Sequence, residues 1–189
     1  MPGASPSAFA ICARRGIAVH ECFGTAVGLA VDVSVENGRP RIHRATAAID
    51  LGLAVNPLTI ESQVQGGLAF GLIQLMAKGA ITFKDGQVEQ RNFHDFTPAY
   101  MKDAPVTVDA HIVPSTEAPT GCGEPPVPVI APAVANALFR LTGKRYRSLP
   151  IVSLCRNNRR TRLMSAMTVV RRRAATSESQ TVYSACSWL

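Results

Sequence analysis

The chain has 189 residues, of which 47% are hydrophobic, and it carries a formal net charge of +7. This length suits one domain or one domain with a tail, and the apolar fraction is typical of a globular core rather than of a charged, disordered chain. Seven arginines and a single acidic residue follow Pro150, so the basic pI of 9.6 describes that segment and does not make the preceding part a nucleic-acid binder.

The cysteines and the apolar runs exclude several further classes of protein. Five scattered cysteines without a C-x-x-C pair disfavour a metal clip, a redox motif and a disulfide scaffold. No apolar run approaches the ~18 residues that a membrane-spanning helix needs. Residues 1–16 lack the basic start and the apolar length of a signal peptide, so we expect no membrane span and no export signal.

Three segments are expected in chain order. Residues 1–15 read as irregular, residues 16–150 as the folded domain, and residues 151–189 as a basic, Ser/Thr-rich and unstructured tail. Within the domain, small apolar and polar residues alternate over 25–36 and again over 39–49, which is the period of a strand. Because Asn37-Gly38 between them is a turn signal, these two runs predict a β-hairpin.

A helix is expected to begin at Asn56-Pro57, with Asn56 as the cap and Pro57 in the first turn. Apolar residues recur after it at helical spacing, from Ile60 to Leu75. Three glycines interrupt this helix, at about 1 kcal/mol each relative to alanine. We expect a compensating close approach of another backbone or of a ligand. These glycines are Gly66, Gly67 and Gly71.

The second half of the domain predicts a short hairpin, a strand and a helix. Residues 80–83 and 87–91 flank the turn 84–86, residues 106–113 read as a strand, and residues 131–141 as an apolar helix ended by Gly143. Such an order of elements predicts an α+β fold, with mixed sheet hairpins packed with two main helices.

The run Gly121-Cys122-Gly123-Glu124-Pro125-Pro126 carries the strongest functional signal. Glycines let a backbone pass close to a bound group, and prolines stiffen the exit from a turn. A single carboxylate, Glu124, is therefore held on a constrained turn where a catalytic base could be positioned.

Five motifs follow one another along the chain in a recognisable order. Together they resemble the C-terminal part of the molybdenum-binding large subunit of the xanthine dehydrogenase/aldehyde oxidase family, over about residues 16–150. The nearest branch resembles isoquinoline 1-oxidoreductase large subunits and related bacterial aldehyde dehydrogenases. The motifs are GIAVHECFG at 16–24, AIDLG at 48–52 with NP at 56–57, QVQGG at 63–67, NFHD at 92–95 and GCGEPP at 121–126.

The resemblance implies a molybdenum–molybdopterin cofactor and the C-terminal cofactor-binding domain of molybdenum hydroxylases. It implies that Glu124 is the general base acting on a metal-bound hydroxyl during oxidation of an aldehyde or N-heterocycle. It places Gln63 near the metal's oxo ligand and Gly123 beside the cofactor. A base in this role has to be partly desolvated so that its pKa rises toward the working pH.

The remaining polar candidates are assigned structural roles. The four histidines (His20, His43, His94 and His111) share no ligand spacing, so no protein-held metal site is predicted, although His20 or His94 could line the cofactor region. Cys122 reads as a small space-filling residue that could touch substrate, and Cys22 is given no chemistry.

The chain is much shorter than the large subunits it resembles. The resemblance therefore implies two protein partners: the missing upstream half of the large subunit and a small [2Fe–2S] iron–sulfur subunit. Apolar surface is expected to be exposed around Val127–Leu138 and Leu68–Leu75, where the missing part would pack. Related enzymes occur on both sides of the bacterial inner membrane, so the cellular location stays open.

Three functional hypotheses remain at this point. The chain is a hydroxylase piece that is inactive alone, or a truncated remnant without a catalytic role, or a binder of nucleic acid or membrane surfaces through its arginines. The third is disfavoured because the arginine-rich tail has few aromatics and no recognised motif. The tail itself is either a basic interaction segment or sequence translated outside the ancestral frame.

Overall fold

The computed structural model describes residues 13–76 and 81–151. All of these residues belong to the first of two units into which the chain divides, Met1–Cys155, and the second unit is Arg156–Leu189. The predictions for the tail and for most of the irregular N-terminal segment therefore lie outside the described residues.

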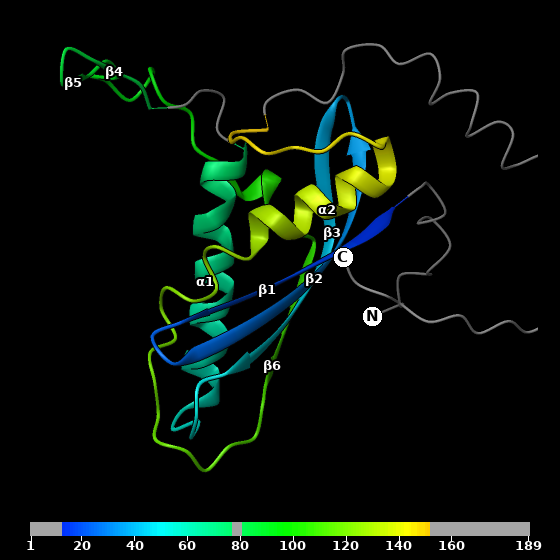
Figure 1. Ribbon diagram of the computed structural model, residues 1–189, viewed down its shortest axis with the longest axis vertical. Coiled ribbons are helices and arrows are strands. Elements are labelled where there is room, and N and C mark those ends of the chain that lie inside the picture. The colour runs from blue at the N-terminus through cyan, green and yellow to red at the C-terminus, as the bar shows by residue number, and fades with distance from the viewer. Residues whose placement is uncertain (1–12, 77–80, 152–189) are drawn as a thin grey trace, which may run out of the picture. The chain divides into compact units, whose positions relative to one another are not determined.

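A four-stranded mixed sheet organises the domain, with strand order β1-β2-β3-β6 (Figure 1). Its strands are β1 (Arg14–Cys22), β2 (Thr25–Glu36), β3 (Arg39–Asp50) and β6 (Thr107–Ile112). The first three pair antiparallel, and β6 pairs parallel to β3. The predicted hairpin over 25–49 is confirmed. Its turn has positive φ at both Asn37 and Gly38, as a two-residue hairpin turn of type I′ requires.

One face of this sheet carries the core. Alternate residues of β2 are buried from Thr25 to Val33, and β3 buries Ile42, Ala45, Ala47 and Ile49 on the same face. A register shift at Asp32/Val33 accounts for the change of parity between Ile42 and Ala45. The two main helices pack on this face, α2 over β1 and β2 and α1 beside β6 and α2.

The two helices match the sequence signals closely. Helix α1 (Pro57–Met76) begins after Asn56, whose side-chain oxygen accepts a 3.3 Å hydrogen bond from the Thr59 N–H. Helix α2 (Ile130–Thr142) ends at Gly143, which is left-handed and donates its N–H to the Phe139 carbonyl. Neither helix, nor any other in the described part of the chain, has the length and apolarity to cross a bilayer.

Other elements differ from the expectations. Strand β1 was not predicted as a strand. The expected hairpin over 80–91 is reduced to β4 (Phe83–Lys84) and β5 (Gln87–Val88), which form a separate two-stranded sheet. A short 3₁₀ turn, η2 (Met101–Asp103), precedes β6.

The expectation of exposed apolar surface around Val127–Leu138 and Leu68–Leu75 is wrong for most of these residues. Leu68, Leu72 and Leu75 of α1 are buried, as are Ile130, Val134 and Leu138 of α2, because the two helices face each other and the sheet. Within the two ranges Phe70 of α1 is exposed, and the other large exposed apolar side chains lie elsewhere, among them Ile17, Val19, Phe23, Leu53, Val55, Leu58, Ile81, Phe83, Phe93, Tyr100 and Met101.

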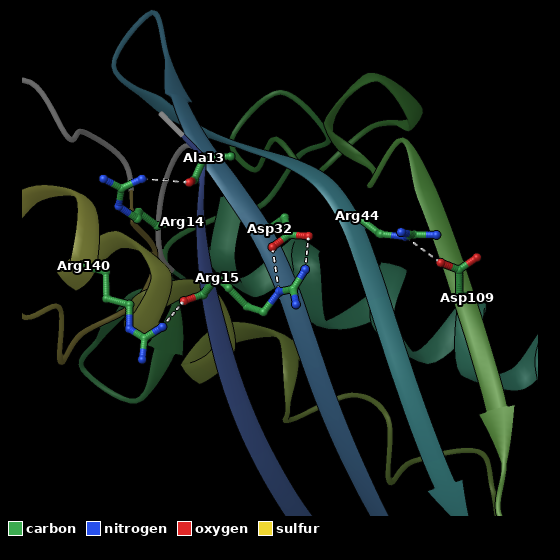
Figure 2. A network of polar contacts seen from close by, with 7 residues as sticks. All are labelled: Ala13, Arg14, Arg15, Asp32, Arg44, Asp109 and Arg140. Atoms are coloured by element: carbon green, nitrogen blue, oxygen red, sulfur yellow. Dashed lines mark hydrogen bonds and ion pairs between the residues drawn. The ribbon is translucent and has the colours of Figure 1, made fainter. Parts of the chain in front are cut away.

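Charged side chains line one end of the opposite sheet face. Figure 2 shows Arg15 paired with Asp32 and Arg44 paired with Asp109, one residue from each of the four strands. The Arg15–Asp32 contact has two hydrogen bonds, of 2.9 and 3.0 Å, and the Arg44–Asp109 contact one of 2.8 Å. Such exposed pairs contribute about 0–1 kcal/mol each. Because Arg15 pairs with Asp32 and Cys22 pairs with Thr25, this charged row lies at the strand ends remote from Thr25.

Candidate functional site

The Gly121–Pro126 turn lies between the first residue of β2 and helix α1. On the sheet side, the Thr25 hydroxyl donates a 2.6 Å hydrogen bond to the Gly121 carbonyl. At its other end the turn closes with a 2.9 Å bond from the Val127 N–H to the Glu124 carbonyl. The motif is therefore a fixed turn rather than a loose loop.

The segment before the turn is tied to the end of β3. The Thr120 N–H donates to the Leu51 carbonyl at 2.8 Å, and the Leu53 N–H donates to the Glu117 carbonyl at 2.9 Å. These bonds hold the incoming backbone alongside the residues that follow β3, which sets the direction in which the turn leaves the sheet.

Two of the three helical glycines fit against the turn. A Cβ on Gly67 would lie 2.9 Å from Pro126 Cβ and 3.4 Å from the Gly123 carbonyl oxygen. A Cβ on Gly71 would contact the Val127 carbonyl oxygen and lie 2.5 Å from Ile130 Cγ2. Close approach of the turn therefore explains these two glycines, as one of the two expected alternatives, another backbone or a ligand, had it. Only Gly66 faces open space, with nothing within 4 Å of its Cβ position.

The structure brings Gln63 and Gly123 together. The Gln63 Oε1 atom lies 4.0 Å from the position that a Cβ on Gly123 would occupy. Gln63 and Glu124 are both exposed, and neither side chain has a hydrogen-bond or ion-pair partner within residues 13–76 and 81–151. The desolvation expected for a catalytic Glu124 is therefore not supplied by the described part of this chain.

The histidines stand apart from this turn and from one another. His43 bonds Ser34 at 2.7 Å, His94 lies 3.2 Å from the Asp95 carboxylate, His20 is half-buried on β1, and His111 is exposed on β6. Among the described residues no group of three or more His, Cys, Asp or Glu side chains could hold a metal ion. Cys122 is half-buried against the core, which suits a space-filling residue.

Two surface hollows lie along α2 rather than at the turn. Asn136, Phe139 and Arg145 line one of them, and the Arg145 guanidinium stacks 3.9 Å from the Phe139 ring centroid. The other lies between Ala131 and Ile151. Gln63, Gly123 and Glu124 line neither hollow, and the Gln63 and Glu124 side chains are exposed on the described part of the chain.

Sequence reasoning missed the two threonines that hold the turn. Thr25 is fully buried, and its Oγ1 lies 2.6 Å from the Thr120 Oγ1. The signal was present, because Thr25 has the same strand parity as the buried Val27, Leu29 and Val31. A hydroxyl at a core position of a strand needs a partner, which predicts a contact from outside the hairpin.

Comparison with known proteins identifies the family to which this chain is similar. Residues 15–105 match the molybdopterin cofactor-binding domain. The chain is 31% identical over 145 residues to the membrane-bound aldehyde dehydrogenase [pyrroloquinoline-quinone] of Gluconacetobacter polyoxogenes, covering 67% of this chain and 18% of that protein. It is 32% identical over 111 residues to the isoquinoline 1-oxidoreductase subunit beta of Brevundimonas diminuta, covering 58% of this chain and 14% of that protein.

A solved structure supports the fold. The aldehyde oxidoreductase from Desulfovibrio desulfuricans superposes with a TM-score of 0.57 at 22% identity, over 67% of this chain and 14% of that one. The chain spans less than a fifth of the length of each of these three proteins. Over that part, the chain belongs to the molybdopterin cofactor-binding domain family found in large subunits of xanthine dehydrogenases and aldehyde oxidoreductases.

Proposed function

We propose that this chain forms part of the large subunit of a molybdenum hydroxylase that oxidises aldehydes or N-heterocycles with oxygen derived from water. The observation that carries the proposal is the juxtaposition of the Gln63 amide with Gly123, next to Glu124, in a chain of this family. The isoquinoline branch and the substrate class are part of the proposal.

The residues at the turn fit a large anionic cofactor bound from the open side. The Gln63 amide offers a donor and an acceptor without net charge, and Gly66 and Gly123 present backbone without side chains. When bound, the molybdenum–pterin group supplies the two-electron oxidation that protein side chains cannot perform. Glu124 acts as the general base that accepts a proton from the attacking oxygen.

The site needs a second polypeptide surface to become complete. Glu124 is exposed, and a base working near neutral pH needs burial to raise its pKa. The upstream part of a full-length large subunit supplies that cover, together with the rest of the cofactor cradle. A small iron–sulfur subunit accepts the electrons, in line with the relative that is itself a subunit beta.

Co-expression of the full chain with a complementary upstream fragment tests this proposal. We expect molybdenum and pterin to be retained only in the complex, with oxidation of an aldehyde or N-heterocycle. Glu124→Gln should lower kcat by about 10²–10⁴-fold with the metal retained. Pyrroloquinoline quinone is measured in parallel, because one relative is named for it.

Glu117→Gln is the matched control, since Glu117 is an exposed carboxylate of the same segment. Equal activity of the Glu124→Gln and Glu117→Gln complexes would contradict the role of Glu124. Molybdenum retained by the chain alone would contradict the need for a second surface.

An inactive remnant is the second candidate, favoured by the exposure of Glu124. A reading-frame shift near codon 150 that restores a family-like ending would support this candidate. A complementary upstream frame beside the gene would support the enzyme.

A further inference from the structure

Thr25 combines complete burial with two short hydrogen bonds to a distant segment. It is 0% exposed, and its hydroxyl oxygen lies 2.6 Å from both the Gly121 carbonyl oxygen and the Thr120 Oγ1. Its partners lie about 95 residues further along the chain. A buried hydroxyl is costly unless its hydrogen bonds are made, so this contact defines the position of the segment it meets.

The number of available protons fixes the direction of these bonds. Thr25 has one hydroxyl proton, and the Gly121 carbonyl can only accept, so Thr25 donates to Gly121. The Thr120 hydroxyl has one proton, which either the Thr25 Oγ1 at 2.6 Å or the Leu51 carbonyl oxygen at 3.0 Å can accept, and the shorter contact favours donation to Thr25. The Leu51 carbonyl still receives the Thr120 N–H at 2.8 Å, so every group in the chain of bonds is satisfied.

This contact fastens one side of the candidate site. Gly121 lies two residues before Gly123, which adjoins the Gln63 amide, and three before Glu124. On the other side, Pro126 and Val127 pack against Gly67 and Gly71 of α1. Without the Thr25 bonds, the described ties of this segment to the sheet are the backbone bonds of Glu117 and Thr120 and the contacts of the Thr120 hydroxyl with the Leu51 and Gly24 carbonyls.

We propose that Thr25 is a positioning residue that fixes the Gly121–Glu124 turn relative to Gln63. The Thr120 hydroxyl completes the lock by donating to Thr25. Its catalytic consequence rests on the proposed function, whereas its mechanical consequence does not. Removing the Thr25 hydroxyl loosens the turn. A variant that keeps a hydroxyl at residue 25 keeps the turn in place.

Cys122 provides a reporter inside the turn. In the full chain with the other four cysteines replaced by alanine, alkylation of the half-buried Cys122 thiol measures how often the turn opens. Thr25→Val keeps the size of the side chain and removes the hydroxyl. We expect the alkylation rate to rise about tenfold, the effect of losing a buried hydrogen bond.

Three variants separate positioning from general destabilisation. Thr25→Ser should alkylate within about twofold of the parent, since it keeps the hydroxyl. Thr46→Val is the matched substitution on the opposite face of the sheet and should have no effect. Val33→Ala, in the core at the far end of β2, lowers stability without touching the turn and should leave the Cys122 rate unchanged under native conditions.

The same variants in the complex with the upstream fragment give the catalytic readout. Thr25→Val should lower kcat with KM within about twofold, and Thr25→Ser should recover it. An unchanged alkylation rate of Cys122 in Thr25→Val, or an equal rise of this rate in Val33→Ala, would overturn the positioning role of Thr25. If the alkylation rates confirm the positioning role of Thr25 but the complex binds no molybdenum, the proposed function is overturned and the positioning role stands.

Discussion

Gly66 and Gly71 lie in the same helix but face different surroundings. A Cβ on Gly71 would contact the Val127 carbonyl and Ile130, whereas a Cβ on Gly66 would meet nothing. We predict that Gly71→Ala lowers the free energy of unfolding by about 1–3 kcal/mol through overpacking. Gly66→Ala should raise it by up to about 1 kcal/mol through helix propensity. Urea unfolding of the two variants measures the difference, and equal effects would contradict the packing described for α1.

Asp95 anchors the NFHD loop through backbone hydrogen bonds. The Arg91 and Asn92 N–H groups donate to its carboxylate at 2.9 and 3.0 Å, and these bonds lower the pKa of Asp95. A carboxyl whose folded pKa is lowered stabilises the loop above its unfolded pKa, and this stabilisation is lost as pH falls through the folded value.

We therefore predict that the loop holds at neutral pH and loosens on acidification. A carbon-detected NMR titration should give a lower pKa for Asp95 in the native chain than in urea. Asp95→Asn should remove the acid-dependent change in amide exchange of Asn92. A native pKa equal to that in urea would contradict the anchoring.

At single residues, the sequence was informative where the chemistry is local. Asn56 and Gly143 were identified because a helix cap depends on neighbours within a few residues. Thr25 was missed because its partners lie about 95 residues away. The roles of Glu124 and Gln63 stay predictions, since both side chains are exposed and neither has a hydrogen-bond or ion-pair partner among the described residues.

Helix α2 covers part of the exposed edge of the sheet. Its Asn136 side chain donates to the Ile17 carbonyl at 3.0 Å and its Arg140 side chain to the Arg15 carbonyl at 3.2 Å. Residues four apart on a helix and two apart on a strand are similarly spaced, so the two bonds form together. They occupy edge carbonyls of β1 that another strand could otherwise pair with.

We predict that the double substitution Asn136→Ala and Arg140→Ala increases aggregation through β1. Light scattering and thioflavin binding on warming measure this effect. Arg147→Ala is the control for loss of charge, because Arg147 is exposed and lies outside the two bonds that α2 makes to this edge. Identical scattering of the double variant and the control would show that the edge is protected by other means.

At the level of elements, local alternation predicted the β2–β3 hairpin, and the apolar spacing predicted both helices. The sequence could not identify the parallel pairing of β3 with β6, because Arg44 and Thr107 lie more than sixty residues apart. Strand β1 was overlooked because its apolar residues Ile17 and Val19 are exposed, so the positions of its apolar residues do not mark a core-facing side. The hairpin over 80–91 was overextended because its side chains find no core to face.

At the scale of the domain, exposed apolar side chains concentrate in residues 81–101. Phe93 is fully exposed and Met101 is 91% exposed, with Phe83 and Tyr100 also accessible. Large exposed apolar residues gathered in one segment indicate a surface that another polypeptide covers. The resemblance predicted such a surface but assigned it to the two helices, whose apolar residues, apart from Phe70, mostly face each other and the sheet.

We predict that the isolated chain associates as its concentration rises and that Phe93→Ser with Met101→Ser reduces this association. Sedimentation velocity over a concentration series measures the effect. Leu149→Ser, at a half-exposed apolar position near the end of the described residues, is the control. A parent chain that stays monomeric at all concentrations would contradict the prediction.

The family and the fold class were accessible from five motifs in order, and both are confirmed. The substrate and the electron acceptor stay proposals, because the chain spans only 18% of the length of one relative and 14% of another. Composition alone would have predicted neither the family nor the fold class.

The bond from Thr25 to the Gly121 carbonyl and the bonds from Thr120 to the Leu51 carbonyl also bear on the order in which the domain assembles. Hairpins close within microseconds, whereas contacts spanning 69 and 96 residues must wait for a much larger loop to close. During synthesis the three-stranded meander can form before the ribosome has even made residue 120. We expect the stretch around Glu124 to be the last to reach its native arrangement, so a nascent chain stalled before that point would hold the three-stranded meander without the Gly121–Pro126 turn.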